Sequence, residues 1–397
     1  TLFKFPLNFM NGLASGATII ISGHCGSKDE KQMHCSIRTA CTVAVILGVI
    51  CSVGGVLLTP WMLNVMSVPE TVYGRAFAYT CIYFGGIWSM VLYNMAAGIL
   101  RAYGDSKRPL YYLIVCCIIN IVLDVLFVIV FHMGVMGVAV ATLIAQAVSA
   151  VLVTLKLMRS EGILKLSVKQ IRFHGSILKM QLKLGLPTGF EAILFSITNI
   201  AIQSAVNTFG TDTTAAWSAY GKLDAIFWMV STAFGIAITT FVGQNYGAGK
   251  MDRVRKSTRV CLLMDFIVSA VLVVFLIAAR FLLFRLFTND SHVIEIGCDM
   301  LVLITPWYIV YVFIEVIAGA LRGVGNVVVP VAITLLGVCV LRIAWLAAML
   351  KISPTISAII LSYPVTWVIT ALAFIIYYIY ITHKTIAGSS KKHVPKL

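Results

Sequence analysis

The chain has 397 residues, of which 60% are hydrophobic and only 11% are charged, and its formal net charge is +15. A mean hydropathy of +0.97 excludes an ordinary soluble domain, because a chain folded in water must draw much of its surface from polar residues. The basic excess by itself would allow nucleic-acid binding, but the placement of the basic residues indicates a membrane topology instead.

Long apolar segments follow one another along the chain and are separated by short polar connections. Each is about as long as the roughly 20 residues that a helix needs to cross a bilayer. None of them alternates in polarity as a barrel strand would. We therefore expect eleven membrane-spanning helices, at about 3–24, 36–59, 73–99, 109–131, 135–157, 185–208, 215–243, 257–287, 293–320, 329–350 and 355–381.

Lysine and arginine concentrate in alternate connections. The segments 28–38, 101–108, 156–183 and 250–259, together with the tail from residue 383, hold most of the 30 basic residues. Cytoplasmic loops of membrane proteins carry such an excess. The basic residues therefore predict orientation, and we expect a multi-pass protein of the cell inner membrane that binds no nucleic acid.

An internal repeat with an offset of 221 residues, the distance from Arg101 to Arg322, relates the two halves of the chain. The segment GILRAYGD at 98–105 reappears as GALRGVGN at 319–326. The same offset pairs further positions: Pro109 with Pro330, Gly26 with Gly247, and Arg38 with Arg259. The interval holds an even number of crossings, so both copies have the same orientation and the repeat is parallel.

These patterns predict an all-α integral membrane protein built from two parallel six-helix lobes. The helix near 185–208 opens the second lobe, and its counterpart would lie before residue 1. We therefore expect twelve helices in the full protein and about eleven here, the first being absent. The predicted domains are an N-terminal lobe at 1–158, an amphipathic cytoplasmic linker at 159–183, a C-terminal lobe at 184–382 and a disordered cytoplasmic tail at 383–397.

Several motifs resemble those of bacterial members of the MATE (multidrug and toxic compound extrusion) family, along the chain from Gly16 to about Tyr380. The motifs are GHCGSKDEK at 23–31, VGQNYGAGK at 242–250, the paired loops LRAYGDSKRP and LRGVGN, and the stretch from Asn120 to Thr142. The resemblance implies antiport, in which Na⁺ or H⁺ moves inward while an amphipathic, usually cationic, compound leaves. It implies no cofactor beyond the coupling ion.

Asp124 is predicted in the middle of a span, where an ionised carboxylate costs several kcal/mol unless it is paired, hydrated or protonated. Asn120 lies one helical turn earlier on the same face, and Thr142 lies in the next predicted helix. Carboxylate, amide and hydroxyl oxygens suit a small hard cation or a titrating proton. The resemblance matches these three residues to a cation-coupling site that also uses an aspartate on the absent helix. A polar patch that only packs two helices is the alternative.

The second lobe offers three candidates for a substrate cavity. Glu191 follows Pro187 by four residues. The resemblance implies an acidic residue on this helix in the central site, although here the acid lies about one turn nearer the proline. Glu315 and Arg342 are predicted on neighbouring helices, where we expect a structural ion pair, with lining of the cargo cavity as the alternative.

The remaining charged residues have simpler interpretations. We expect Asp224 and Lys222 to form a solvated pair near the outer end of their helix. Arg101 and Arg322 are expected to neutralise the carbonyls that end their helices. The His and Cys residues match no spacing known for metal ligands, so no metal site is predicted.

The predicted function is secondary active multidrug efflux by a monomer in contact with membrane lipids, exporting small drugs or organic cations. The sequence leaves the coupling ion, Na⁺ or H⁺, and the cargo open. A lipid-linked oligosaccharide flippase of the same superfamily is the alternative. A flippase that handles pyrophosphate should line its cavity with Arg and Lys, whereas the ions inside the predicted spans are mainly acidic. An enzyme is disfavoured, because the chain contains no HExxH or nucleophile motif.

Overall fold

The computed structural model describes residues 4–160, 164 and 173–388, and every regular element within them is a helix. This confirms the predicted all-α class. A backbone that crosses hydrocarbon must satisfy its hydrogen bonds within the segment, and a helix does so.

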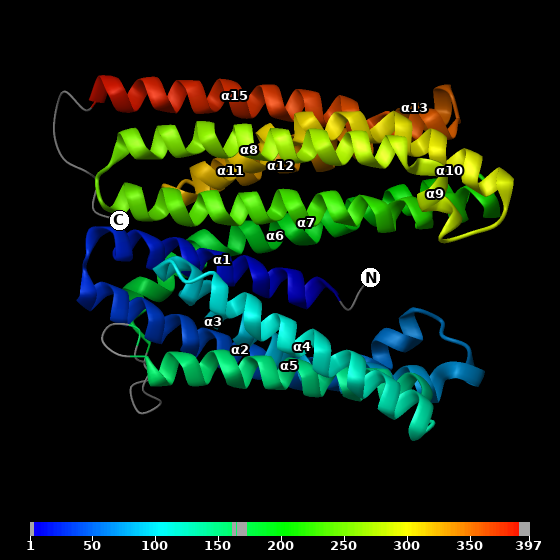
Figure 1. The fold of residues 1–397 in the computed structure, drawn as a ribbon, viewed down its shortest axis with the longest axis horizontal. Coiled ribbons are helices and arrows are strands. Elements are labelled where there is room, and N and C mark those ends of the chain that lie inside the picture. The colour runs from blue at the N-terminus through cyan, green and yellow to red at the C-terminus, as the bar shows by residue number, and fades with distance from the viewer. Residues whose placement is uncertain (1–3, 161–163, 165–172, 389–397) are drawn as a thin grey trace. The chain divides into compact units, whose positions relative to one another are not determined.

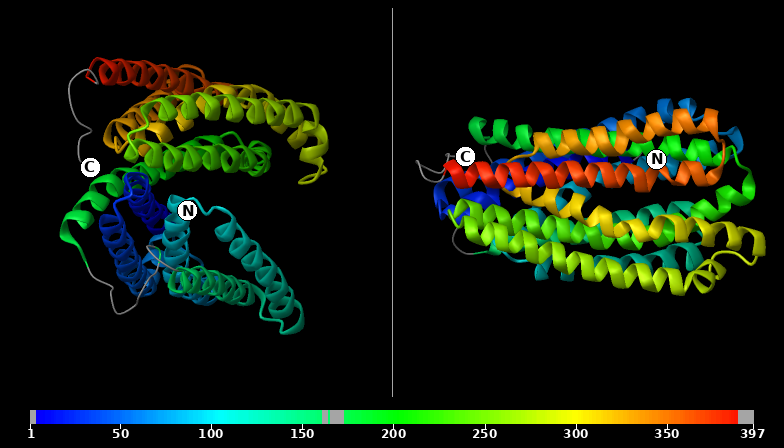
Figure 2. Two further views of the ribbon diagram at one scale, coloured as in Figure 1. Left: turned by 60° about the vertical axis from the view of Figure 1, so that its left-hand side comes forward. Right: turned by 90° about the horizontal axis from the view of Figure 1, so that it is seen from above.

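The chain divides into two compact units, Thr1–Gly189 and Phe190–Leu397, and each is described by itself (Figure 1). The long helices of the first unit lie side by side (Figure 2). In chain order they are α1 (Lys4–Ser27), α2 (Glu30–Val65), α3 (Glu70–Tyr103), α4 (Lys107–Val125) with its π-helical continuation η1 (Leu126–Val130), α5 (Gly134–Arg159), and α6 (Gly175–Asn207) as far as Gly189.

The second unit, as far as the structure describes it, holds the rest of α6 and nine further helices, with a 3₁₀ turn and a π-helical segment among them. In chain order these are α7 (Thr211–Gly247), α8 (Met251–Ala278), α9 (Arg280–Arg285), α10 (Ser291–Ile304), the 3₁₀ turn η4 (Thr305–Trp307), α11 (Tyr308–Gly323), α12 (Val328–Thr334), the π-helical η5 (Leu335–Val340), α13 (Leu341–Ile352), α14 (Ile356–Ile360) and α15 (Ser362–Gly388). Pro306, in η4, separates α10 from α11 because its ring cannot continue a regular helix.

Ten helical segments among the described residues are long and apolar enough to cross a membrane, from Glu30–Val65 to Ile356–His383. They confirm ten of the eleven predicted spans. The eleventh, α1, is 24 residues long but is not among the ten. It carries the polar amides of Asn8 and Asn11 and many small residues, which lower its mean hydropathy.

The internal repeat is visible in the helix boundaries. When α2 is shifted by 221 residues it covers 251–286, and the second unit has α8 and α9 over 251–285. When α3 is shifted in the same way it covers 291–324, and α10 to α11 cover 291–323. The turns also match, because Gly104 has φ 105° and Gly325 has φ 84°. Each glycine N–H donates to the carbonyl of the arginine three residues earlier, at 2.9 Å. Glycine adopts this left-handed helix end without strain.

The structure describes only parts of the predicted linker and of the predicted tail. α6 begins at Gly175, so the end of the segment 159–183 is helical. Residues 161–163 and 165–172 of that segment lie outside the described residues. α15 continues to Gly388, so residues 383–388 of the tail predicted at 383–397 are helical, and residues 389–397 lie outside the described residues.

Equivalent helices occupy the centre of each unit. α3 packs against α1, α2 and α5 in the first unit, and α11 packs against α7, α8 and α15 in the second. Both helices end in nearly continuous buried runs, from Met95 to Leu100 and from Val316 to Leu321. Charged side chains on α11 are therefore held in the interior of the second unit.

Candidate functional site

The polar cluster of the first unit lies where α4 packs against α5. The Nδ2 atom of Asn120 donates a hydrogen bond to Oγ1 of Thr142 at 3.4 Å. The Thr142 hydroxyl in turn donates to the carbonyl of Val138, one turn earlier, at 2.9 Å. The structure thus brings together two of the three residues predicted to couple an ion.

Asp124 lies one turn after Asn120 on α4, and it is partly buried. Its Oδ1 atom is shielded from solvent and has no hydrogen-bond partner among the described residues. The helix changes to the π-helical η1 at Leu126, two residues further on. π-Helical turns often occur at functional sites. A carboxylate oxygen without a partner among the described residues, one helical turn from an amide that bonds a hydroxyl, gives an oxygen set that a small cation or a proton could occupy.

A charged cluster in the second unit joins α6 and α11. Arg322 lies between two carboxylates: its Nη2 atom is 4.0 Å from Oε1 of Glu191, and its Nη1 atom is 4.0 Å from Oε1 of Glu315. The side chains are 18%, 13% and 17% exposed, respectively. A Cβ on Gly235 of α7 would overlap the Glu315 carboxylate, so this glycine provides the space that the acid occupies. With one cation and two acids, the cluster carries an excess of negative charge.

Arg342 does not pair with Glu315, so the predicted ion pair between them is wrong. Its Nη2 atom donates to Oγ1 of Thr366 at 3.0 Å, and its guanidinium carbon lies 4.0 Å from the ring centroid of Tyr363. This side chain is buried, and its cation lies over the aromatic face of an α15 residue. The partner of Glu315 is Arg322, on its own helix.

The predicted solvated pair of Asp224 and Lys222 is also wrong. Asp224 accepts a hydrogen bond from Nε1 of Trp228 at 2.7 Å, and it accepts from the hydroxyls of Tyr308 and Tyr220. Lys222 is exposed on another face of α7. The acid is enclosed because its neighbours on α7 and α11 are aromatic residues that each provide a polar hydrogen.

One buried acid was not among the predicted site residues. Asp265, in the middle of α8, is fully buried. Its Oδ1 atom accepts from the hydroxyl of Ser269 at 3.2 Å, and its Oδ2 atom has no partner among the described residues. The signal was available, because Asp265 is a single acid inside a long apolar span.

No group of three or more His, Cys, Asp or Glu side chains within the described parts of the chain is arranged to hold a metal ion. The oxygen set of Asn120, Asp124 and Thr142 is of another kind, because only one of its three members is a carboxylate. It suits a weakly held, exchangeable cation or a proton rather than a resident metal.

Comparison with known proteins identifies the family. The MatE family model matches residues 1–126 and 187–346. The chain is similar to the probable multidrug resistance protein YoeA of Bacillus subtilis, with 30% identity over 85% of this chain and 74% of the relative. It is also similar to the probable multidrug resistance protein YpnP of the same organism, with 28% identity over 86% of this chain and 76% of the relative.

A solved structure shares the fold. The crystal structure of a MATE protein in the bent conformation matches with a TM-score of 0.90 and 18% identity, over 98% of this chain and 87% of the other. The family match, the relatives and the spans lead to one conclusion: the chain belongs to the MatE family and is a bacterial-type, multi-pass transporter of the cell inner membrane.

Proposed function

We propose that the protein exports amphipathic, cationic small molecules in exchange for Na⁺ or H⁺ that moves inward. The names of its relatives, multidrug resistance proteins, support the cargo class. The observation that carries the coupling part is the Asp124 carboxylate oxygen, which has no hydrogen-bond partner in the described part of the chain and lies one turn after Asn120, itself bonded to Thr142.

The coupling step follows from the electrostatics of a carboxylate in a membrane. Ionised Asp124 is stable when water reaches it, and dehydration favours its neutral form. A proton or a sodium ion that reaches the site neutralises this charge and removes the penalty for closing α4 and α5 around it. Asn120 and Thr142 supply the neutral oxygens that a sodium ion would need, whereas a proton needs the carboxylate alone.

The charged cluster of Glu191, Glu315 and Arg322 is the part of the second unit that we assign to the cargo. Its excess of acid favours a cation over an anion. It also argues against the alternative of an oligosaccharide flippase, because a pyrophosphate group would meet two carboxylates and one guanidinium. The contacts that form each polar cluster join residues of one chain, which supports a monomer as the working unit.

The test is transport of a fluorescent organic cation by the full chain, reconstituted in proteoliposomes, with H⁺ and Na⁺ gradients imposed separately. We expect one of the gradients to drive transport in the wild type and to lose that effect in Asp124→Asn. The matched control is Asp105→Asn, which removes an acid that pairs with Arg108 at 2.9 Å in a polar connection. Gradient-driven transport that survives in Asp124→Asn would contradict the coupling role, and an absence of cation transport by the wild type would contradict the cargo class.

Thr142 gives a way to distinguish the ions. Thr142→Val removes the hydroxyl oxygen and keeps the side-chain shape, whereas Thr142→Ser keeps the hydroxyl. If Na⁺ is the coupling ion, Thr142→Val should raise the sodium concentration for half-maximal transport, and Thr142→Ser should not. If H⁺ is the coupling ion, both variants should keep the wild-type dependence on the proton gradient.

A further inference from the structure

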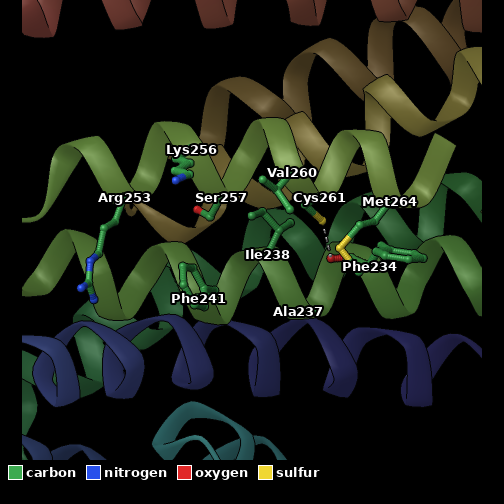
Figure 3. Close-up of a pocket in the computed structure, with 10 residues that line it drawn as sticks. All are labelled: Phe234, Ala237, Ile238, Phe241, Arg253, Lys256, Ser257, Val260, Cys261 and Met264. Carbon is green, nitrogen blue, oxygen red and sulfur yellow. Dashed lines mark hydrogen bonds between the residues drawn. The ribbon is translucent and has the colours of Figure 1, made fainter. Parts of the chain in front are cut away.

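A groove in the second unit runs between α7 and α8 and has a volume of about 520 Å³ (Figure 3). Each helix contributes a stripe of residues three or four positions apart, which is the spacing of one helical face. The lining residues are Phe234, Ala237, Ile238 and Phe241 of α7 and Arg253, Lys256, Ser257, Val260, Cys261 and Met264 of α8.

The groove is basic at one end and apolar along the rest of its length. Arg253 and Lys256 both lie toward one end, and Phe234 and Met264 lie toward the other (Figure 3). Three of the apolar side chains are open to the surroundings, since Phe241 is 47%, Val260 is 46% and Met264 is 53% exposed, whereas Ile238 is buried at the floor of the groove. An open apolar wall with a cationic end matches an amphiphile that has an anionic head.

The length of the groove fits one leaflet of a bilayer. From Arg253 to Met264, α8 rises by about 16 Å, at about 1.5 Å per residue. Half of a hydrocarbon core of about 30 Å is about 15 Å. The basic connection at 250–259 faces the cytoplasm by its Lys and Arg content, so the basic end lies at the inner membrane surface and the apolar wall lies within the inner leaflet.

We propose that this groove binds an anionic glycerophospholipid of the inner leaflet, with phosphatidylglycerol as the probe. The lipid phosphate contacts the guanidinium of Arg253 and the ammonium of Lys256, and an acyl chain lies along Phe241 and Val260 toward Met264. Two basic residues at its entrance disfavour an exported cation in this groove. A free phosphate would leave the apolar wall unused.

The first test removes the charges. The full chain is reconstituted in nanodiscs of phosphatidylcholine that contain increasing phosphatidylglycerol, and the lipid retained after extraction is measured by native mass spectrometry. Arg253→Gln with Lys256→Gln should weaken retention about 30-fold, which corresponds to about 2 kcal/mol at about 1 kcal/mol per basic residue near an anionic surface. The matched control is Arg255→Gln with Arg259→Gln, which removes the same charge from the same helix outside the groove.

The second test fills the groove without changing charge. Ala237→Phe places a ring on the apolar wall, whereas Ala233→Phe places the same ring one turn earlier on α7, on an exposed position outside the groove. We expect Ala237→Phe to reduce phosphatidylglycerol retention at least tenfold and Ala233→Phe to leave it unchanged. Thermal unfolding of each variant in phosphatidylcholine alone shows whether the fold is intact.

Three results would overturn the proposal. The first is wild-type retention in the variant that lacks Arg253 and Lys256. The second is an equal effect of Ala237→Phe and Ala233→Phe. The third is displacement of the lipid by soluble glycerol 3-phosphate at the same concentration as the lipid. This would mean that the site binds the anionic head and that the acyl chain contributes nothing to binding.

Discussion

Replacing Arg322 by methionine removes the only cation of the charged cluster in the second unit. The structure holds the guanidinium 4.0 Å from each of Glu191 and Glu315, and the three side chains are less than one-fifth exposed. Removing one partner from a buried ion pair costs about 3–5 kcal/mol, because it leaves a buried charge without compensation. Both contacts are at the outer limit of an ion pair, so we expect a loss of about 3 kcal/mol in the free energy of unfolding.

The measurement is unfolding by SDS in mixed micelles, followed by tryptophan fluorescence. A triple variant, Arg322→Met with Glu191→Gln and Glu315→Gln, distinguishes charge from packing. It removes the two carboxylates that the single change leaves without a cation, and it should recover at least half of the lost stability. Arg101→Met is the matched control, because Arg101 is the repeat equivalent of Arg322 and should cost less.

Two results would refute this reasoning. A loss below about 1 kcal/mol for Arg322→Met would mean that the cluster is solvated and behaves as a surface ion pair. A triple variant as unstable as the single variant would mean that Arg322 stabilises the unit through its alkyl chain and not through its charge.

Two further substitutions test the packing of the second unit. A Cβ at Gly323 would lie 2.6 Å from the carbonyl oxygen of Thr239, so Gly323→Ala should lower the free energy of unfolding by about 1–3 kcal/mol. Gly221 has open space around it, so Gly221→Ala should raise the free energy of unfolding slightly. Thermal unfolding of both variants tests these two expectations. Arg342→Lys keeps the charge but removes the planar guanidinium, whose carbon lies 4.0 Å from the ring centroid of Tyr363. Unfolding by SDS should show that the free energy of unfolding falls by about 1–2 kcal/mol. An unchanged unfolding midpoint would contradict a stacking role.

Features set by local spacing and hydropathy could be predicted from the sequence. The order and approximate positions of the spans, the 221-residue offset and the turns at Gly104 and Gly325 follow from patterns that each segment carries by itself. The pairing of Arg322 with Glu315 was also accessible. The two residues are seven positions apart on α11, which is two turns and the same face, and an arginine side chain points back toward the start of its helix.

The surroundings of Asp224 and Arg342 could not be predicted in the same way. Asp224 has hydrogen-bond partners on α7 and on α11, and Arg342 has its partners on α15. Which face of one helix meets which face of another depends on packing angles and helix rotation, and periodicity along one segment does not contain these. An acid near an exposed lysine therefore looked solvated, although aromatic residues from a distant helix enclose it.

The two units share a helical backbone but carry different polar side chains at equivalent positions of the repeat. The offset of 221 pairs Asn120 with Leu341 and Asp124 with Trp345, so the second unit lacks the oxygen set of the first. The first unit in turn lacks an acid that the second unit has. The position equivalent to Glu315 is Asn94, a neutral amide whose Nδ2 donates to Oδ1 of Asn11 at 3.0 Å. The glycine turns that follow residues 101 and 322 are retained in both units, and each turn is closed by a backbone hydrogen bond from the glycine N–H to the arginine carbonyl. The two units differ in the positions of their buried carboxylates. Each unit therefore keeps a different set of acids on a common frame, and an ion site in one unit with a cargo site in the other needs no change in the fold.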